Sequence, residues 1–247
     1  MINKITKLGY SKREVEELLK VSKDINKDYQ KLLKGYPIQY LIGYVDFYGN
    51  KILVNNDVLI PRYETEYLIE KTIKYSKQFF GENKINILDI GTGSGCIPIT
   101  LKKQLNCNVE ACDISDKALN LAKQNAKSNL VDIKFTKSNL FENIDNKFDI
   151  IISNPPYISK NEKIMDSVFN YEPHIALFAE DNGLYFYKEI LKDAKKYLND
   201  KFIIIFEIGY MQGEAIKKII NENFNNVKVK LETDLSDKNR YIFVFSE

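Results

Sequence analysis

The feature that most constrains this 247-residue chain is an apolar run followed by a glycine-rich turn and a helical pattern. Ile85 to Ile90 (INILDI) predicts a buried strand, Gly91 to Gly95 (GTGSG) a tight turn, and the following CIPITLKKQL a helix. Such a unit brings backbone close to a ligand at the carboxyl edge of a parallel sheet. The dinucleotide fingerprint would place glycine at position 96, which is Cys96 here. The G-x-G-x-G pattern therefore favours an adenosine ligand without a pyrophosphate.

The next predicted strand, Asn108 to Cys112, ends at an acidic residue, Asp113, 22 residues after Gly91. A carboxylate near that spacing, at the tip of the second strand, can accept both hydroxyl protons of a ribose. Asp113 could instead cap the following helix, Asp116 to Asn129, for which Ser115 is a rival cap. We favour the ribose contact.

A second apolar run ends in two prolines. Phe148 to Tyr157 (FDIIISNPPY) predicts a buried strand that stops at Asn154, because Pro155 cannot continue a ladder. Neither Pro155 nor Pro156 has an N–H, so the Asn154 Oδ1 atom and the Pro155 carbonyl remain as fixed acceptors. Two acceptors can hold a planar NH2 group, and the Tyr157 ring lying over it would complete a slot for an amide or for the exocyclic amine of a base. The alternative is a simple turn with Tyr157 as a surface aromatic.

Strand and helix patterns alternate from residue 85 onward and end in two strands without a helix between them. This order predicts an α/β fold with a doubly wound, seven-stranded, Rossmann-like sheet whose last strand is antiparallel. Upstream, Ser11 to Leu33 predicts amphipathic helices with a capping box, and Ile38 to Ile60 a β-hairpin. Pro61 then opens a helix that continues to about Phe79. The predicted parts are a helical N-terminal cap (1–36), a hairpin linker (37–60) and a main domain (61–247).

The segment 161–181 follows the tetrapeptide directly and has weak periodicity, so we expect it to form a wall or lid of the site. It contains the only histidine, His174, which we interpret as a structural hydrogen-bonding residue. One histidine cannot form a metal site or a catalytic triad by itself. Cys96, Cys107 and Cys112 lack C-x-x-C spacing, so we predict neither a metal site nor a disulfide framework.

Composition and charge argue against nucleic-acid-binding, membrane and secreted proteins. The chain is 44% apolar and 28% charged with a net charge of +2, which provides no strong phosphate-binding surface and makes direct nucleic-acid binding unlikely. No apolar run approaches the roughly 18 residues of a membrane span. The N-terminal sequence lacks the apolar region of a signal peptide. We therefore expect a cytoplasmic protein that does not contact membranes.

With these motifs after its first, second and fourth strands, the main domain resembles S-adenosylmethionine-dependent methyltransferases that act on planar amino groups. The finer resemblance is to the PrmC/HemK family of peptide chain release factor N5-glutamine methyltransferases, over about residues 36 to 247. The LIPRYETE stretch is the discriminating one, because nucleic-acid amino methyltransferases do not usually carry it. The motifs are PIQYLIG (37–43), FYG (47–49), LIPRYETE (59–66), DIGTGSG (89–95), NPPY (154–157), YEP (171–173) and EIG (207–209).

The resemblance implies S-adenosyl-L-methionine as cofactor and, as substrate, the glutamine of the Gly-Gly-Gln motif of class-I release factors. The alternatives are an adenine-N6 or guanine-N2 nucleic-acid methyltransferase, a ribosomal-protein glutamine methyltransferase, a nicotinamide oxidoreductase and a non-catalytic binding module. The residues implied for the cofactor are Gly91, Thr92, Gly93, Ser94, Gly95, Asp113, Leu140 and Asn154. Those implied for the glutamine are Asn154, Pro155, Pro156 and Tyr157, with Asn154, Pro155 and Tyr157 as the catalytic group.

Two departures from the family pattern affect this interpretation. The helical region before Pro37 is shorter than the family's usual amino-terminal domain, which leaves open how a release factor is held. Asn139 stands where the family commonly has an acid before the Leu140 position, so one adenine contact is also open.

Overall fold

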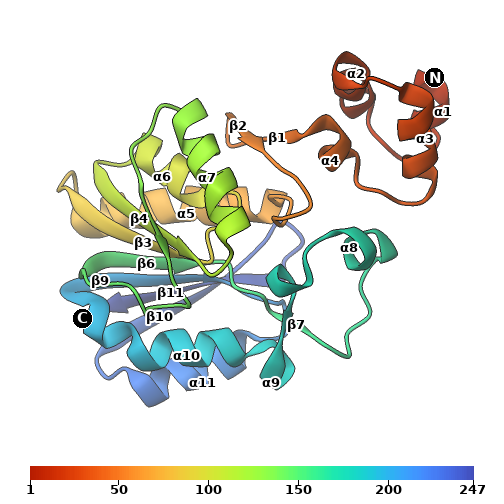
Figure 1. Ribbon diagram of the computed structural model, residues 1–247. Coiled ribbons are helices and arrows are strands. Elements are labelled where there is room, and N and C mark those ends of the chain that lie inside the picture. The colour runs from red at the N-terminus through yellow and green to blue at the C-terminus, as the bar shows by residue number, and fades with distance from the viewer.

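A seven-stranded sheet forms the centre of the computed structural model, which describes residues 1–247 (Figure 1). Its strand order is β10-β11-β9-β6-β3-β4-β5. Strand β11 runs antiparallel to both of its neighbours, whereas the other pairs are parallel. The predicted doubly wound α/β fold with an antiparallel last strand is therefore confirmed. The strands are β3 (Ile85–Ile90), β4 (Cys107–Asp113), β5 (Lys134–Lys137), β6 (Phe148–Ser153), β9 (Leu198–Glu207), β10 (Val227–Thr233) and β11 (Asn239–Ser246).

Helices cover both faces of this sheet, which explains why its strands are continuous apolar runs and do not alternate with polar residues (Figure 1). In β9, Ile203 and Ile205 lie in the core shared with α5 and α6, whereas Ile204 and Phe206 lie in the core shared with α10 and α11. A polar residue at any of these positions would be buried. The covering helices are α5 (Tyr63–Phe80), α6 (Cys96–Gln104), α7 (Asp116–Ser128), α10 (Tyr185–Ala194) with the 3₁₀ turn η2 (Lys195–Tyr197), and α11 (Gly213–Asn223).

The chain reverses its winding at β3, which pairs with β4 on one side and β6 on the other. Ligands of open α/β sheets bind outside the carboxyl ends of the strands at such a switch point. Gly91, Asp113, Ser138 and Asn154 are the residues at or just after the carboxyl ends of β3, β4, β5 and β6. The topology therefore brings the predicted ligand-binding motifs to one edge.

The N-terminal helices form a separate cluster beside the sheet (Figure 1). The predicted capping box is present, because Ser11 and Glu14 exchange hydrogen bonds at the start of α2. A small core of Ile5, Val15, Leu18, Leu32 and Ile38 holds the cluster together. Its helices are α1 (Ile2–Thr6), α2 (Lys12–Val21), α3 (Ile25–Leu33) and α4 (Ile38–Ile42).

The prediction of a β-hairpin over the whole of 38–60 is wrong for its first five residues, which form α4. Pro37 precedes this helix, Gly43 ends it with a φ of 84°, and Ile38, Leu41 and Ile42 pack on the cap core at helical spacing. The strand prediction failed here because IQYLI is almost wholly apolar and fits the alternating pattern of a strand as well as the pattern of a helix. The hairpin itself consists of β1 (Tyr44–Phe47) and β2 (Asn50–Leu53).

The hairpin packs on the main domain, and Asn125 of α7 bonds both the N–H and the carbonyl of Leu53. On the other side of the site, the segment after β6 folds as short elements: β7 (Ile158–Ser159), α8 (Asp166–Tyr171), the 3₁₀ turn η1 (His174–Ala176), β8 (Phe178–Ala179) and α9 (Glu180–Gly183). The lengths and hydropathies of the helices show none capable of crossing a membrane.

Candidate active site

A cavity of about 300 Å³ opens at the carboxyl edge of the sheet. The ends of β3, β4, β5 and β6 form its floor. Its walls come from residues 57–59 and 61–62, from Ile175 and Ala176, and from the start of α10. Nearly all of the residues proposed from the sequence line it, from Gly91 to Ser94 and including Asp113, Leu140, Asn154, Pro155 and Pro156. Gly95 and Tyr157 do not.

The glycines of the turn after β3 have two different roles. Gly91 and Gly93 have φ angles of 75° and 55°, and a Cβ built on either would meet no protein atom within 4 Å. They therefore leave open the space that a ligand would fill. A Cβ on Gly95 would lie 3.1 Å from the Cβ of Ala122, so Gly95 permits the close packing of α6 against α7. This difference explains why Gly95 lies outside the cavity.

Asp113 is already held by backbone N–H groups. Its Oδ2 accepts from Gly93 N at 2.9 Å and its Oδ1 from Ser115 N at 2.9 Å. Burial raises the pKa of this carboxyl above its ordinary value, although these hydrogen bonds oppose the shift. The side chain that caps α7 is Ser115, which accepts from Ala118 N, so the capping interpretation of Asp113 is wrong. Each carboxylate oxygen keeps a lone pair for a hydroxyl donor from the cavity.

Two polar side chains near the glycine turn make no hydrogen bond of ordinary length. They are Asp89, both of whose carboxylate oxygens are buried, and Thr92, whose hydroxyl is buried. Thr92 is nevertheless close enough to the Asp89 carboxyl to oppose the effect of burial on its pKa. Asp89 is 0% exposed, and burial raises the pKa of its carboxyl to about 7. The sequence interpretation did not include Asp89, although a lone acid in INILDI was the available signal. Unpaired buried groups of this kind usually mark a missing ligand or water.

This donor set fits S-adenosylmethionine. Among the residues that line the cavity, Asp113 suits its ribose, and the apolar side chains of Ile114 and Leu140 suit its adenine plane. Asp89 is buried behind this lining, in the strand that leads into the glycine turn. Leu140 adopts a left-handed φ of 51°, and its carbonyl accepts from Ser138 Oγ at 2.8 Å. Asn139 also lines the cavity, and its side chain donates to Glu142 at 3.0 Å.

The acceptor end of the cavity is formed by Asn154 and Pro155. The Asn154 Nδ2 atom donates to Thr65 Oγ1 at 3.3 Å, and Thr65 donates to Glu207 Oε2 at 2.7 Å. Neither the Asn154 Oδ1 atom nor the Pro155 carbonyl is bonded by a donor of the chain. The two acceptors expected from the sequence are therefore free at the cavity wall. Thr65 and Glu207 were not among the predicted site residues.

The Tyr157 ring is not where the sequence interpretation placed it. It does not line the cavity but packs against the core beneath α10 and α11. Burial raises the pKa of its phenol well above the ordinary value, and the charge of Glu207 acts in the same direction. Its carbonyl accepts from Gln212 Nε2 at 2.9 Å. The packed ring and the bond to its carbonyl hold the end of the tetrapeptide in place.

The predicted wall over 161–181 is present, with Ile175 and Ala176 on the cavity. It is fixed by Glu172, whose carboxylate accepts from Arg62 Nη2 at 2.6 Å and from Ile60 N at 3.2 Å. His174 is outside the cavity lining and bonds the Phe169 carbonyl at 2.7 Å. No group of three or more His, Cys, Asp or Glu side chains is arranged to hold a metal ion.

Comparison with known proteins first identifies the domain. Residues 68–172 match the family described as Methyltransferase small domain. A methyltransferase from Pyrococcus furiosus is 20% identical with a TM-score of 0.62, over 80% of this chain and 89% of that one. A Thermus thermophilus 16S rRNA methyltransferase, solved in complex with AdoMet and guanosine, is 15% identical with a TM-score of 0.58, over 83% and 50%. These likenesses show that the fold is that of the Rossmann-like methyltransferases.

Relatives with higher sequence identity identify the family within this fold. The release factor glutamine methyltransferase of Lactococcus lactis is 39% identical, over 98% of this chain and 89% of its own length. Those of Streptococcus pneumoniae and Flavobacterium psychrophilum are 42% and 44% identical, over 87% and 82% of this chain and 77% and 73% of their own. The resemblance stated from the motifs is confirmed, and the chain belongs to the release factor glutamine methyltransferase family.

Proposed function

We propose that this chain transfers a methyl group from S-adenosylmethionine to the side-chain amide nitrogen (N5) of the glutamine in the Gly-Gly-Gln motif of class-I release factors. The observation that carries the proposal is the pair of unoccupied acceptors, Asn154 Oδ1 and the Pro155 carbonyl, at the wall of a cavity that fits the cofactor. Family membership supports the choice of substrate. As a substrate of this enzyme is part of the translation apparatus, we place the reaction in the cytoplasm.

The proposed cofactor site is the end of the cavity formed by the glycine turn. Gly91 to Ser94 would form the cradle, with Gly95 behind it against α7; Asp113 would accept from the ribose, and Leu140 would border the adenine. Thr92 lines this end with a hydroxyl that makes no hydrogen bond of ordinary length, and Asp89 is buried behind it. S-adenosylmethionine, when bound, supplies an electrophilic methyl group on a sulfonium.

The chain's own contribution would be to hold and polarise the glutamine amide. An amide nitrogen is a poor nucleophile because its lone pair is delocalised into the carbonyl. Asn154 Oδ1 and the Pro155 carbonyl would each accept one N–H, which aims the nitrogen into the cavity and stabilises the positive charge that develops on it. The extra proton of the methylated amide is acidic enough to leave to water. No general base is required, and His174 lies outside the cavity.

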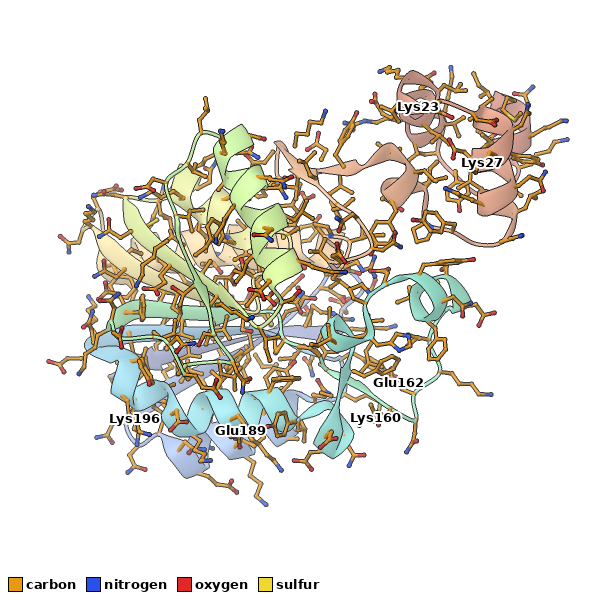
Figure 2. All side chains as sticks on the ribbon, viewed as in Figure 1. Lys23, Lys27, Lys160, Glu162, Glu189 and Lys196 are labelled. Atoms are coloured by element: carbon orange, nitrogen blue, oxygen red, sulfur yellow. The ribbon has the colours of Figure 1, made fainter.

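We propose that the cap (1–36), the linker (37–60) and the methyltransferase domain (61–247) are the functional parts of the chain. By its packing, α4 joins the cap. The cap contains nine Lys or Arg and five Asp or Glu residues, so it is basic, and Lys23 and Lys27 are on its surface (Figure 2). A basic cap suits an acidic face of a protein substrate.

The test is mass spectrometry of a purified release factor after incubation with the chain and S-adenosylmethionine. We expect one added methyl group on the Gly-Gly-Gln peptide, and none when the loop glutamine is replaced by glutamate. Parallel incubations with DNA, rRNA and ribosomal proteins separate the alternatives. Methyl transfer to a nucleic acid alone would overturn the proposal, and transfer to none of these would favour a non-catalytic binding module.

A further inference from the structure

Asn154 poses a problem of orientation. The oxygen and nitrogen of its side-chain amide have nearly the same shape, yet only the oxygen can accept an N–H from a substrate amide. A half-turn of the amide would present two donors to the cavity instead. Something in the protein must therefore determine which atom faces the substrate.

A chain of hydrogen bonds behind the amide does so. An ionised Glu207 carboxylate can only accept, so the single hydroxyl proton of Thr65 is directed to it, at 2.7 Å. Thr65 Oγ1 then has only lone pairs left for Asn154. The Asn154 atom 3.3 Å from Thr65 Oγ1 must therefore donate, and it is Nδ2. The Asn154 side chain also interacts directly with the Glu207 carboxyl, which keeps its donor on the same side. The Oδ1 atom is thereby turned toward the cavity.

The arrangement is built into three separate elements of the main domain. Thr65 is on α5, Asn154 follows β6, and Glu207 ends β9, the neighbour of β6 in the sheet. Thr65 is 3% exposed and Glu207 1% exposed, so water does not compete for these bonds. Burying a carboxylate in an apolar strand destabilises the fold unless it is hydrogen-bonded. Glu207 is hydrogen-bonded by Thr65, which in turn is bonded by Asn154 at the substrate end of the cavity.

Resting on the proposed function, we infer that Thr65 and Glu207 are positioning residues that set the direction of the Asn154 amide and so make the site selective for an amide over a carboxylate. With Oδ1 toward the cavity, the site attracts NH2 and repels a glutamate carboxylate. With Nδ2 toward the cavity, the preference would weaken or reverse.

The first test compares Thr65→Val, which keeps the shape but removes the hydroxyl, with Thr65→Ser, which keeps it. Binding is measured to a release factor with its loop glutamine and to the same protein with glutamate there. We expect Thr65→Val to reduce the glutamine preference by about tenfold and kcat by at least as much, and Thr65→Ser to stay within about threefold of wild type. The inference would be overturned if the two variants changed the glutamine preference equally, because the preference would then not depend on the Thr65 hydroxyl. A merely structural loss would lower kcat without changing the preference.

The second test uses pH. A protonated Glu207 can donate to Thr65, and the Thr65 proton is then free to point to Asn154. The hydrogen bonds no longer determine which atom of the Asn154 amide faces the cavity. Burial raises the pKa of Glu207 to about 7, so kcat should fall as pH decreases through that value. In Glu207→Gln this acid limb should be absent. The titratable or charged groups near Glu207 are Glu64, Cys96, Tyr157, Tyr187, Arg240 and Tyr241.

A measurement without substrate separates this inference from the proposed function. The side-chain NH2 signals of Asn154 in a ¹⁵N spectrum, identified by their loss in Asn154→Ala, should shift between pH 6 and 8 in wild type. They should not shift in Glu207→Gln, and the shift should be smaller in Thr65→Val than in wild type; the folding of both variants is checked by S-adenosylhomocysteine binding. A shift of wild-type size in both variants would overturn the inference even if release factors are methylated. Failure to methylate a release factor, with the expected signals present, would overturn only the proposed function.

Discussion

A buried carboxylate lies behind each end of the cavity, and the two differ in how they are bonded. Asp89, in the strand that leads into the glycine turn, has the Thr92 hydroxyl nearby but makes no hydrogen bond of ordinary length. Glu207, at the acceptor end, is bonded by Thr65. Burial raises the pKa of both to about 7. The two carboxyl groups therefore have similarly raised pKa values but differ in hydrogen bonding, because only Glu207 accepts a bond of ordinary length.

This difference indicates how each end works. The acceptor end is preorganised, since Thr65 and Asn154 are already in place before a substrate arrives, and preorganised polar groups need no rearrangement during reaction. The glycine-turn end still has a polar group to offer a ligand, because Thr92 lines the cavity and its hydroxyl makes no hydrogen bond of ordinary length. Substitutions at the acceptor end should therefore change turnover, and those at the other end should change cofactor affinity.

The largest expected effect is at the acceptor end. Asn154→Ala removes one of two acceptors to a nitrogen that develops positive charge, and we expect kcat to fall by about 10²-fold or more. S-adenosylhomocysteine affinity, measured by calorimetry, should change much less. Asn139→Ala is the matched control, as Asn139 lines the same cavity but bonds Glu142. Comparable losses of kcat in the two variants would remove the distinction between the ends.

The next effect is at the cofactor end. Asp113→Ala should weaken S-adenosylhomocysteine binding by about 1.5–3 kcal/mol, or about 10- to 150-fold in Kd, because a charged acceptor is lost. Asp116→Ala serves as control, since Asp116 is a neighbouring exposed aspartate outside the cavity lining. Calorimetry with NAD in parallel checks the ligand class. Micromolar NAD affinity without S-adenosylhomocysteine binding would contradict the assignment of this end.

A smaller effect is expected at Asp89, where substitution should stabilise the ligand-free protein but weaken its binding of S-adenosylhomocysteine. Its folded-state pKa is about 7 against an ordinary value of about 3.9. The stability it contributes is therefore fully present below pH 3.9 or so and is lost as pH rises through about 7. At pH 8, Asp89→Asn should raise the Tm of the ligand-free protein by roughly 5 °C while weakening S-adenosylhomocysteine binding about tenfold.

The control for Asp89 is pH itself. At about pH 4 the carboxyl is largely protonated in both the folded and the unfolded chain, so the Tm difference from Asp89→Asn should largely disappear there and grow as pH rises toward 7. A variant that is less stable than wild type at pH 8, or that binds the ligand equally well, would show that Asp89 is an ordinary buried group. The contrast between the two carboxylates would then have no functional meaning.

Much of this arrangement could be predicted from sequence because local patterns determine it. The apolar runs, the glycine turn and the terminal strand pair predicted the sheet, and Asp113 and Asn154 followed as the residues at strand ends. The Pro155 carbonyl is a free acceptor because no N–H follows it at Pro156, whereas the direction of the Asn154 Oδ1 acceptor depends on Thr65 and Glu207. Helix α4 was missed because a five-residue apolar stretch fits a strand as well as a helix.

The rest depends on which distant segments meet. Thr65 and Glu207 are 142 positions apart, and nothing in either local pattern indicates that they contact. Tyr157 was assigned to the cavity from its neighbours in sequence, whereas its ring packs against the core and is not part of the cavity lining. Glu172 was recognised only as part of a motif, and its bond to Arg62 joins segments 110 positions apart. Side-chain partners across elements need the structure.

The smallest expected effect is at the only histidine, and it separates the two possible sources of a pH limb near neutrality. His174 bonds a backbone carbonyl outside the cavity, so His174→Ala should reduce kcat less than tenfold or so. The acid limb that we assign to Glu207 should persist in His174→Ala and be absent in Glu207→Gln. Both pH–rate profiles are measured with saturating cofactor and release factor. A limb that disappears in His174→Ala instead would show that a histidine base acts in the reaction and that the acceptor end is not sufficient.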